Sequence, residues 1–424
     1  MATAASSNDW RPRFFTVWAS QAVSLLGSSI AGFALVWWLT ATTGSANVLV
    51  ASALANTLPL VLIGPLAGTL VDRWNRRRLM MAADGSIALV SAWLAYLFWM
   101  GQAQPWHVFV LMAARGLGSA FHYAAFQSSV VMMVPEEQLT RVNGLSQALR
   151  AAMNILSPPL GALLMSVTSL GAIMLVDVST AMAAVLLLGL VTIPQPSRAA
   201  AGAEGGSSVW SEMMDGLRYI RSWRALALLI GASAVLDLVI NPPMYLLPLL
   251  VTDHFGGQAT QLATIESFLS VGLVVGGALL AAWGGFRRRM VTVIAALIGG
   301  AVCLAAVAAA PSRSFWLAVA GMAGFGFVLP LVNGPVMAII QAHVDPAIQG
   351  RVMTLILSIS QAAVPLGLVI SGPFAEAFGV RPLFAIAAVV FLAAGLGALL
   401  IPALRHFEDS RQPRTGPAVV RGAE

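Results

Sequence analysis

Twelve long apolar runs dominate this sequence and restrict it to a membrane fold. A helix that crosses the hydrocarbon core needs about 20 mostly apolar residues, and each run has about that length. Only 9% of the 424 residues are charged and 58% are hydrophobic, so the polar surface of a soluble enzyme, a nucleic-acid binder or a disordered scaffold is missing. A β-barrel would show short alternating segments instead. We therefore expect an all-α membrane protein with twelve transmembrane helices near residues 14–40, 46–71, 79–100, 106–130, 146–166, 169–193, 225–252, 260–284, 290–310, 315–339, 353–377 and 382–403.

The arginines orient these helices. All 23 basic residues are arginine, and they lie in short clusters between the apolar runs, which argues against a nucleic-acid partner. With the N-terminus in the cytoplasm, Arg313 and Arg381 fall outside, Arg115 falls within a helix, and the remaining 20 fall inside. Because positive residues are enriched on the cytoplasmic side, we expect both termini in the cytoplasm and a multi-pass protein of the bacterial cytoplasmic membrane.

A linker of small residues divides the apolar runs six and six. Residues 194–208 read PQPSRAAAGAEGGSS, and residues 209–221 alternate apolar and charged faces at helical spacing. We expect this second part to be an amphipathic helix on the inner membrane surface. The predicted organisation is an N-terminal six-helix bundle (1–193), a cytoplasmic linker with the amphipathic helix (194–222), a C-terminal six-helix bundle (223–404) and a cytoplasmic tail (405–424).

The two halves also resemble each other in sequence. Gly68-Thr-Leu-Val-Asp72-Arg73-Trp74 aligns with Gly277-Ala-Leu-Leu-Ala281-Ala282-Trp283 at an offset of 209 residues. Arg141-Val142 aligns with Arg351-Val352 at an offset of 210 residues. Two matches at nearly one offset indicate a duplicated six-helix unit, so we expect two pseudo-symmetric bundles.

The connection after the second apolar run carries a motif. Gly68-Thr-Leu-Val-Asp72-Arg73 is followed by Trp74-Asn75-Arg76-Arg77, which is similar to the first-loop signature of the major facilitator superfamily, with Asn75 where a glycine is usual. The resemblance implies that Asp72 faces the start of the eleventh transmembrane helix, near Gly350 and Arg351, and latches the two halves in one state. The gating residues it implies are Gly68, Asp72, Arg73, Arg76, Arg77 and Arg351.

Within that superfamily the chain most resembles drug exporters of the macrolide-efflux type, over most of its length. The likeness is carried by Trp18-Ala-Ser-Gln21, Arg115-Gly-Leu-Gly-Ser-Ala-Phe-His122, Val134-Pro-Glu-Glu137, Gly284-Gly285-Phe286 and Gly350-Arg351-Val352. In the fifth run, Ser157-Pro158-Pro159-Leu-Gly161 is similar to the antiporter motif of exporters, with Ser157 and Ala162 in place of two glycines. Close packing of helices explains these small residues nearly as well, so Ser157, Pro158 and Gly161 are candidate motif residues with a packing alternative.

Five ionisable residues lie within the predicted helices: Asp84, Arg115, Asp177, Asp237 and Glu266. Charged groups at this depth are costly and normally face a cavity or a partner. Four acids against one base leave unpartnered carboxyls, which favours a proton-coupled carrier in which Glu266, Asp237, Asp177 and Arg115 take part. Structural alternatives stay open: Glu266 reaches the membrane surface, Asp177 only pairs with Arg115, and Asp84 is structural beside the neighbouring arginines.

Polar residues recur at intervals of three and four in several runs, which places them on one helix face. Gln21, Ser24 and Ser28 form such a stripe in the first run, and Arg115, Ser119 and His122 form another in the fourth. In the family that the chain resembles, the first, fourth, seventh and tenth helices line a central cavity. A packing role for His122 remains the alternative. The predicted cavity residues are Gln21, Ser24, Ser28, Ser119, His122, Asn154, Asn241 and Asn333.

These features predict a secondary active exporter that exchanges protons for a bulky amphipathic compound of the macrolide type by alternating access. Alternatives on the same fold carry a siderophore, another natural product or a lysophospholipid, and an alternative of a different class is a non-transporting membrane sensor. An enzyme is not expected, because the sequence shows no nucleophile–base set, metal-ligand cluster or phosphate-binding loop. We expect no catalytic residue, no metal, no cofactor beyond the proton gradient as energy source, a small-molecule substrate, a lipid bilayer around the protein, and a monomer.

Overall fold

Helices account for every regular element in the part of the chain that the computed structural model describes, which is residues 10–193, 209–344 and 346–401. Twelve of these helices are long and apolar enough to cross a membrane, which confirms the predicted all-α membrane fold. The helices are α1 (Trp10–Thr43), α2 (Ala46–Arg73), α3 (Arg76–Trp99), α4 (Pro105–Met133), α5 (Glu136–Val167), α6 (Leu170–Leu190), α7 (Val209–Ser222), α8 (Arg224–Tyr245), α9 (Leu247–Leu249), a π-helical turn (Leu250–His254), α10 (Ala259–Trp283), α11 (Arg289–Ala309), α12 (Phe315–His343), α13 (Pro346–Phe378) and α14 (Arg381–Leu400).

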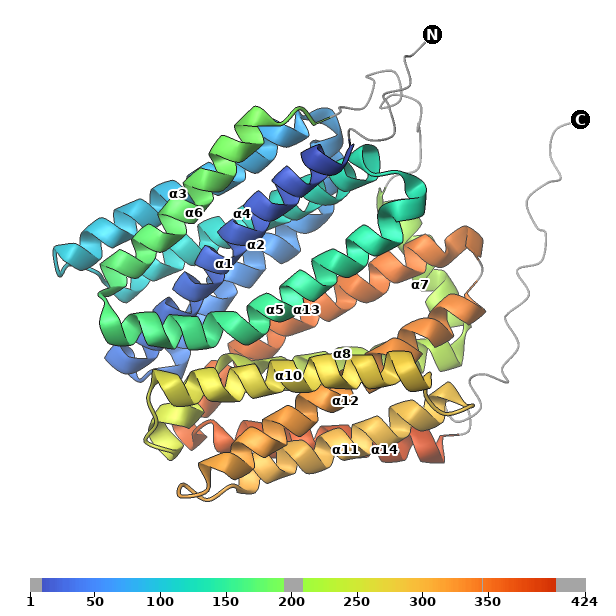
Figure 1. The fold of residues 1–424 in the computed structure, drawn as a ribbon. Coiled ribbons are helices and arrows are strands. Elements are labelled where there is room, and N and C mark those ends of the chain that lie inside the picture. The colour runs from blue at the N-terminus through green and yellow to red at the C-terminus, as the bar shows by residue number, and fades with distance from the viewer. Residues whose placement is uncertain (1–9, 194–208, 345, 402–424) are drawn as a thin grey trace, which may run out of the picture.

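The helices form two bundles with matching internal packing (Figure 1). In the first bundle α2 packs on α4 and α3 on α6, and in the second α10 packs on α12 and α11 on α14. Helices α4 and α12 have 29 residues each and begin at Pro105 and Phe315, an offset of 210 residues (315 − 105). The structure thus repeats the offset seen in the sequence, and the pseudo-symmetric pair of six-helix bundles is confirmed.

Several helix ends differ from the apolar runs. Helix α5 begins at Glu136, ten residues before the predicted run, because residues 136–145 continue the helix with polar side chains beyond its apolar part. Helix α8 ends at Tyr245, although the apolar run continues to residue 252. Pro248 lacks the N–H that would continue the helical hydrogen bonds, so the chain forms the short helix α9 and then the π-helical turn.

Small residues let the helices within each bundle approach closely. A Cβ on Gly116 of α4 would collide with the backbone carbonyl of Asn56 in α2. The symmetry-related helix pair behaves alike, since a Cβ on Gly326 of α12 would collide with the Leu269 carbonyl in α10. Without a hydrophobic effect between helices in lipid, this close contact is a main source of their attraction.

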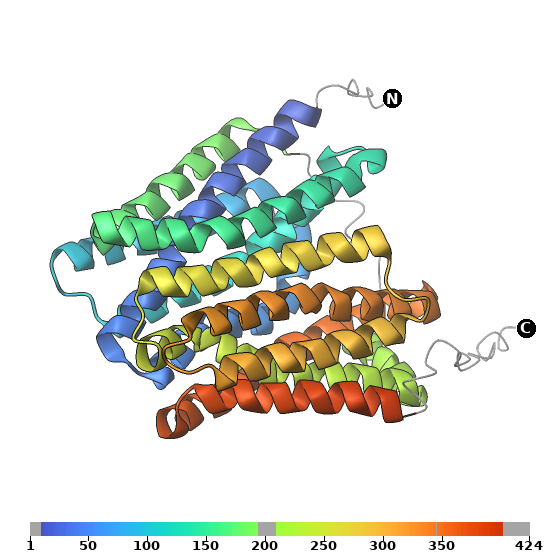
Figure 2. The same cartoon turned by 60° about the horizontal axis from the view of Figure 1, so that its bottom comes forward.

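The two bundles are packed together at one end and separated at the other. At the end where α1 finishes, one continuous core contains residues of both bundles, including Leu39 and Leu250. At the end where α1 begins, the core divides into one cluster around Phe14 in the N-terminal bundle and another around Leu226 in the C-terminal bundle. The same divergence is visible toward the right of Figures 1 and 2, and we call this the open end.

Helix α7 follows the linker and packs on α13 and α8. Tyr219 and Ile220 are buried there together with Trp223, in the core of the C-terminal bundle at its open end. The last turn of α7 is therefore covered by protein, and the predicted position of this amphipathic helix on the inner membrane surface stays a prediction. The linker 194–208 and the tail from residue 402 lie outside the described residues.

Candidate functional site

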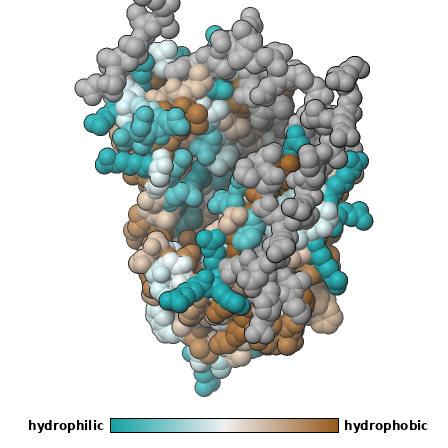
Figure 3. Space-filling view, turned by 90° about the vertical axis from the view of Figure 1, so that its right-hand side faces the viewer, coloured by the Kyte–Doolittle hydropathy of each residue, from teal (hydrophilic) through white to brown (hydrophobic). Residues whose placement is uncertain are grey.

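A cavity of about 840 Å³ lies against the N-terminal bundle and opens between the two bundles. Its wall is built by α1, α2, α3, α4 and α5, and the other bundle contributes Tyr245 of α8 and Gln361 of α13. Figure 3 looks onto the open end, where hydrophilic side chains surround a hollow. A largely apolar wall with a few polar groups is typical of sites for small molecules, and this volume suits a large one.

Five of the eight predicted cavity residues line this cavity, namely Gln21, Ser24, Ser28, Ser119 and His122. The other three belong to surfaces elsewhere. Asn154 accepts a hydrogen bond from Ser270 through its backbone carbonyl (3.3 Å), and Asn241 donates to the backbone of its own helix. Asn333 lies in α12, which contributes no residue to this wall. The helical spacing of polar residues therefore predicted which faces of α1 and α4 line the cavity. The asparagines predicted on α5, α8 and α12 do not line it.

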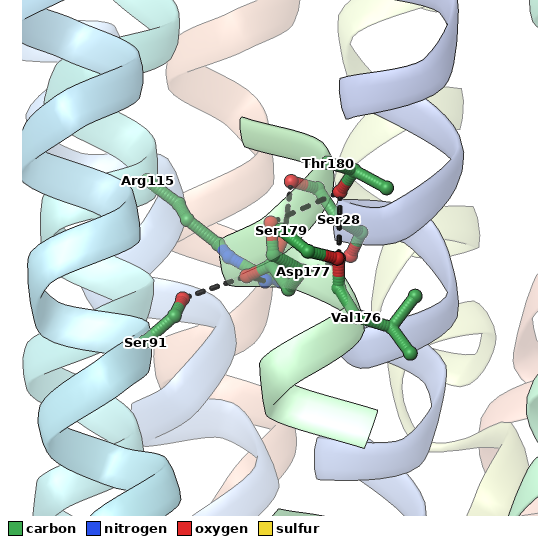
Figure 4. Close-up of polar contacts among 7 residues, drawn as sticks. All are labelled: Ser28, Ser91, Arg115, Val176, Asp177, Ser179 and Thr180. Atoms are coloured by element: carbon green, nitrogen blue, oxygen red, sulfur yellow. Dashed lines mark hydrogen bonds and ion pairs between the residues drawn. The ribbon is translucent and has the colours of Figure 1, made fainter. Parts of the chain in front are cut away.

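Asp177 is the centre of a buried polar cluster that joins four helices of the N-terminal bundle (Figure 4). Its carboxylate accepts hydrogen bonds from Ser28 of α1 (2.7 Å) and Ser91 of α3 (2.6 Å). Arg115 of α4 forms an ion pair with it at 2.7 Å and also donates to the Ser28 carbonyl at 3.1 Å. The Asp177 side chain has no exposed surface, and that of Arg115 is 11% exposed, so this charge pair is almost fully enclosed.

A second polar group lies on the cavity wall closer to the open end. Gln21 of α1 donates to one oxygen of Asp84 in α3 at 3.2 Å. The other oxygen of Asp84 faces Nε2 of His122 in α4 at 3.7 Å. All three side chains line the cavity, so Asp84 belongs to the candidate site, although its sequence position beside the arginines suggested a structural role.

Aromatic side chains complete this part of the wall. The Arg150 guanidinium lies 5.8 Å from the centre of the Tyr123 ring, and the Phe126 ring stacks on His122 with centroids 6.4 Å apart. Trp18 of α1 donates its indole N–H to Ser146 of α5 at 3.3 Å. These residues give the cavity flat apolar surfaces next to its charged groups.

Glu266 and Asp237 lie outside this wall. Glu266 is in α10, whose next residue, Ser267, donates to the Ile155 carbonyl of α5 at 3.0 Å. It therefore lies beside the contact surface of α10 and α5, which joins the two bundles. Asp237 lies partly buried in α8, where the Ser360 hydroxyl of α13 interacts with its carboxyl.

The gating motif is described only in part. Gly68, Asp72 and Arg73 lie in α2, but their side chains are outside the described residues, so the latch near Gly350 stays a prediction. Among the other predicted gating residues, Arg76 is buried and donates to the Ser128 carbonyl (3.4 Å), Arg77 donates to the Val191 carbonyl (3.1 Å), and Arg351 is exposed.

A polar contact that the sequence did not indicate closes the opposite end. Glu376 near the end of α13 accepts a hydrogen bond from the Ser45 hydroxyl and another from the Asn47 backbone N–H at 3.1 Å. Ser45 is the N-cap of α2, whose first N–H groups lack partners within the helix. The carboxylate of one bundle thus satisfies a helix start of the other.

The antiporter-like segment lies within α5, which continues through Pro158 and Pro159. A Cβ on Gly161 would approach the Phe33 ring of α1 to 2.7 Å, so this glycine allows α1 and α5 to pack closely. Ser157 is buried beside it, as is Pro158. Over the described ranges, no group of three His, Cys, Asp or Glu side chains has an arrangement that would hold a metal ion.

Comparison with known proteins identifies relatives along the whole chain. The family model described as Major Facilitator Superfamily matches residues 17–363 and 229–421. Macrolide efflux protein A of Streptococcus pyogenes is 32% identical over 401 residues, which cover 95% of this chain and 98% of that protein. Multidrug efflux pump Tap of Mycolicibacterium fortuitum is 28% identical, over 91% of this chain and 95% of its own length.

Solved structures share the fold at low sequence identity. A bacterial homologue of the human lysosomal transporter Spinster, in an inward-facing and unoccupied conformation, superposes with a TM-score of 0.66 at 14% identity. The superposition covers 96% of this chain and 100% of that one. At this identity the likeness concerns the arrangement of the helices alone.

Proposed function

We propose that this chain, which belongs to the Major Facilitator Superfamily, exports bulky amphipathic drugs of the macrolide type in exchange for protons. The family makes it a multi-pass membrane transporter and not an enzyme. The observation that carries the export proposal is the 32% identity to Macrolide efflux protein A over nearly the full length of both chains. The cavity of about 840 Å³ with aromatic and polar walls supports it, because a large amphipathic ligand needs both kinds of surface.

The proposed orientation places both termini in the cytoplasm of a bacterial cell, so the open end faces inward. In this state a drug would enter the cavity from the cytoplasm or the inner leaflet. Alternating access then requires the closed end to separate, which breaks the contact of Glu376 with Ser45 and the shared core around Leu39. The same motion would bring the open ends together, where the resemblance places the latch of Asp72.

Protons are the proposed energy source, with no bound cofactor. Within the described residues neither Glu266 nor Asp237 forms an ion pair, so each carboxyl is suited to carry a proton through the cycle. Asp177 and Arg115 were predicted to share this task. Their enclosed ion pair is costly to open, so we assign them the positioning of α4 and α6 within the N-terminal bundle.

Drug accumulation in cells tests this proposal. A bacterial strain without its own macrolide exporters would express the protein, and the uptake of radiolabelled erythromycin would be followed with and without a protonophore. We expect expression to lower accumulation, the protonophore to restore it, and Glu266→Gln or Asp237→Asn to abolish the difference. Accumulation that is equal with and without the protein would overturn the proposed substrate class. We further propose that the protein works as a monomer, since the two bundles of a single chain form the cavity.

A further inference from the structure

We propose that Asp84, His122 and Gln21 form a cation site in the cavity wall, at which a proton and the ammonium group of a substrate exclude each other. The biological meaning of this site rests on the proposed function, because it would couple drug loading to proton release. The site itself follows from geometry, burial and charge.

Three helices supply the site, and each supplies one polar side chain. Gln21 of α1 holds one carboxylate oxygen of Asp84 at 3.2 Å. The second oxygen lies 3.7 Å from Nε2 of His122, which is beyond hydrogen-bonding distance. Nε2 is buried and has no hydrogen-bond partner among the described residues. A buried polar atom without a partner is costly, so the pair would be completed by a proton on Nε2 or by a cation on the cavity side of the Asp84 carboxylate.

The surrounding charges leave this site short of a cation. Asp177 of α6 is a further acid that acts on Asp84, and Arg115 pairs with it. Arg150 of α5 is the cation that acts on His122, and it lies exposed over the Tyr123 ring instead of reaching the carboxylate. Asp84 is 7% exposed, and an enclosed carboxylate that is held only by an amide needs compensating positive charge.

Two occupants supply that charge. In the first, a proton on His122 makes an imidazolium that faces the Asp84 carboxylate. In the second, the cationic group of a substrate lies against the Asp84 carboxylate, and the His122 imidazolium releases its Nε2 proton to the water of the cavity and becomes a neutral imidazole. One positive charge replaces one positive charge, and no covalent bond changes except the N–H bond that releases the proton.

The cavity wall next to the site suits an organic cation. Trp18, Tyr123 and Phe126 line the same cavity, and the faces of aromatic rings attract ammonium groups. The imidazole of His122 can take up a proton at Nε2 and then donate from both ring nitrogens, which makes it the member of the pair suited to proton exchange. A neutral amphipathic molecule would use the aromatic surfaces without displacing the proton.

Binding of tetraphenylphosphonium, a permanent organic cation, tests the proposal on the purified full-length protein in lipid nanodiscs without any gradient. We expect affinity to fall as the pH is lowered from about 8 to about 6, by at most tenfold per pH unit, because one proton is exchanged for one cation. Asp84→Asn should weaken binding at the higher pH by about 10-fold or more and remove the pH dependence. His122→Gln should keep binding and flatten the pH dependence.

Asp253→Asn is the matched control, because this carboxylate is exposed in the π-helical turn at the closed end, away from the cavity. It should bind like the wild type. Helix content and melting of every variant would be measured, and if Asp84→Asn fails to fold, the pH profile of His122→Gln decides. Wild-type affinity and pH dependence in these variants would overturn the cation site. Correct cation exchange in a protein that exports no drug would support the site and overturn the proposed function alone.

Discussion

Substituting Asp177 by asparagine should destabilise the N-terminal bundle more than any other change of similar size. Asparagine fits the same space and keeps one oxygen, but it removes the charge that Arg115 faces at 2.7 Å. Asp177 also receives hydrogen bonds from Ser28 and Ser91, so one side chain holds α1, α3, α4 and α6 together. The change therefore tests whether this cluster organises the wall of the cavity.

The size of the effect follows from the burial of the pair. Removing one partner of a buried ion pair costs about 3–5 kcal/mol, because the remaining charge is left without compensation. The Asp177 side chain has no exposed surface and that of Arg115 is 11% exposed where it lines the cavity, so water replaces the lost carboxylate only in part. At about 2–4 °C per kcal/mol, the melting temperature should fall by about 6–20 °C. Ser91→Ala removes a single hydrogen bond to the charged group and should cost about 1.5–3 kcal/mol.

Thermal unfolding of the purified protein, followed by the circular dichroism of its helices, measures these shifts. The double variant Asp177→Asn with Arg115→Leu removes both charges, so no uncompensated charge is left buried in the bundle. We expect the double variant to melt above the Asp177→Asn single variant. A destabilisation below about 1 kcal/mol for Asp177→Asn would refute the assigned role of the pair. So would a cost of the double variant that equals the sum of the costs of Asp177→Asn and Arg115→Leu measured separately.

Three further changes test other parts of the structure. Glu376→Gln weakens the contact between α13 and the start of α2 at the end where the two bundles are packed together. Labelling from outside of a cysteine at the buried position Val50 (Val50→Cys) should then rise about 5-fold, which corresponds to about 1 kcal/mol of lost contact energy. Unchanged labelling would contradict this role of Glu376. Gly116→Val should cost about 1–3 kcal/mol in a thermal melt, because its side chain meets the α2 backbone, whereas Gly144→Ala, with open space around it, should not. Ser119→Trp fills part of the cavity and should reduce erythromycin export without lowering the melting temperature; full export would exclude this cavity as the drug site.

The sequence predicted correctly those features that depend on a single helix, such as which residues share one of its faces. Gln21, Ser24 and Ser28 recur at helical spacing, so they share a face wherever α1 is placed, and that face lines the cavity. The twelve spans follow from run length in the same way, with errors only at their ends. The break after Tyr245 was missed because apolar composition alone does not register that Pro248 interrupts the backbone hydrogen bonds.

Features that depend on how helices meet were beyond the sequence. Asp84 lies near the arginine cluster in the chain, but Arg76 and Arg77 turn to backbone carbonyls of α4 and the end of α6, while Asp84 turns to His122. Glu376 sits in an ordinary position near a helix end, and only the packing of the two bundles brings it to the start of α2. The roles proposed for Glu266 and Asp237 stay predictions.

The central claim is the exchange of protons for drug through the open cavity, and inside-out membrane vesicles test it most directly. With an acidified lumen and a fluorescent dye that reports the pH gradient, added erythromycin should dissipate the gradient in vesicles that contain the protein. Control vesicles without the protein should not respond, and Glu266→Gln or Asp237→Asn should lose the response. A pH gradient that erythromycin leaves unchanged at every concentration, in vesicles with folded protein, would contradict the account.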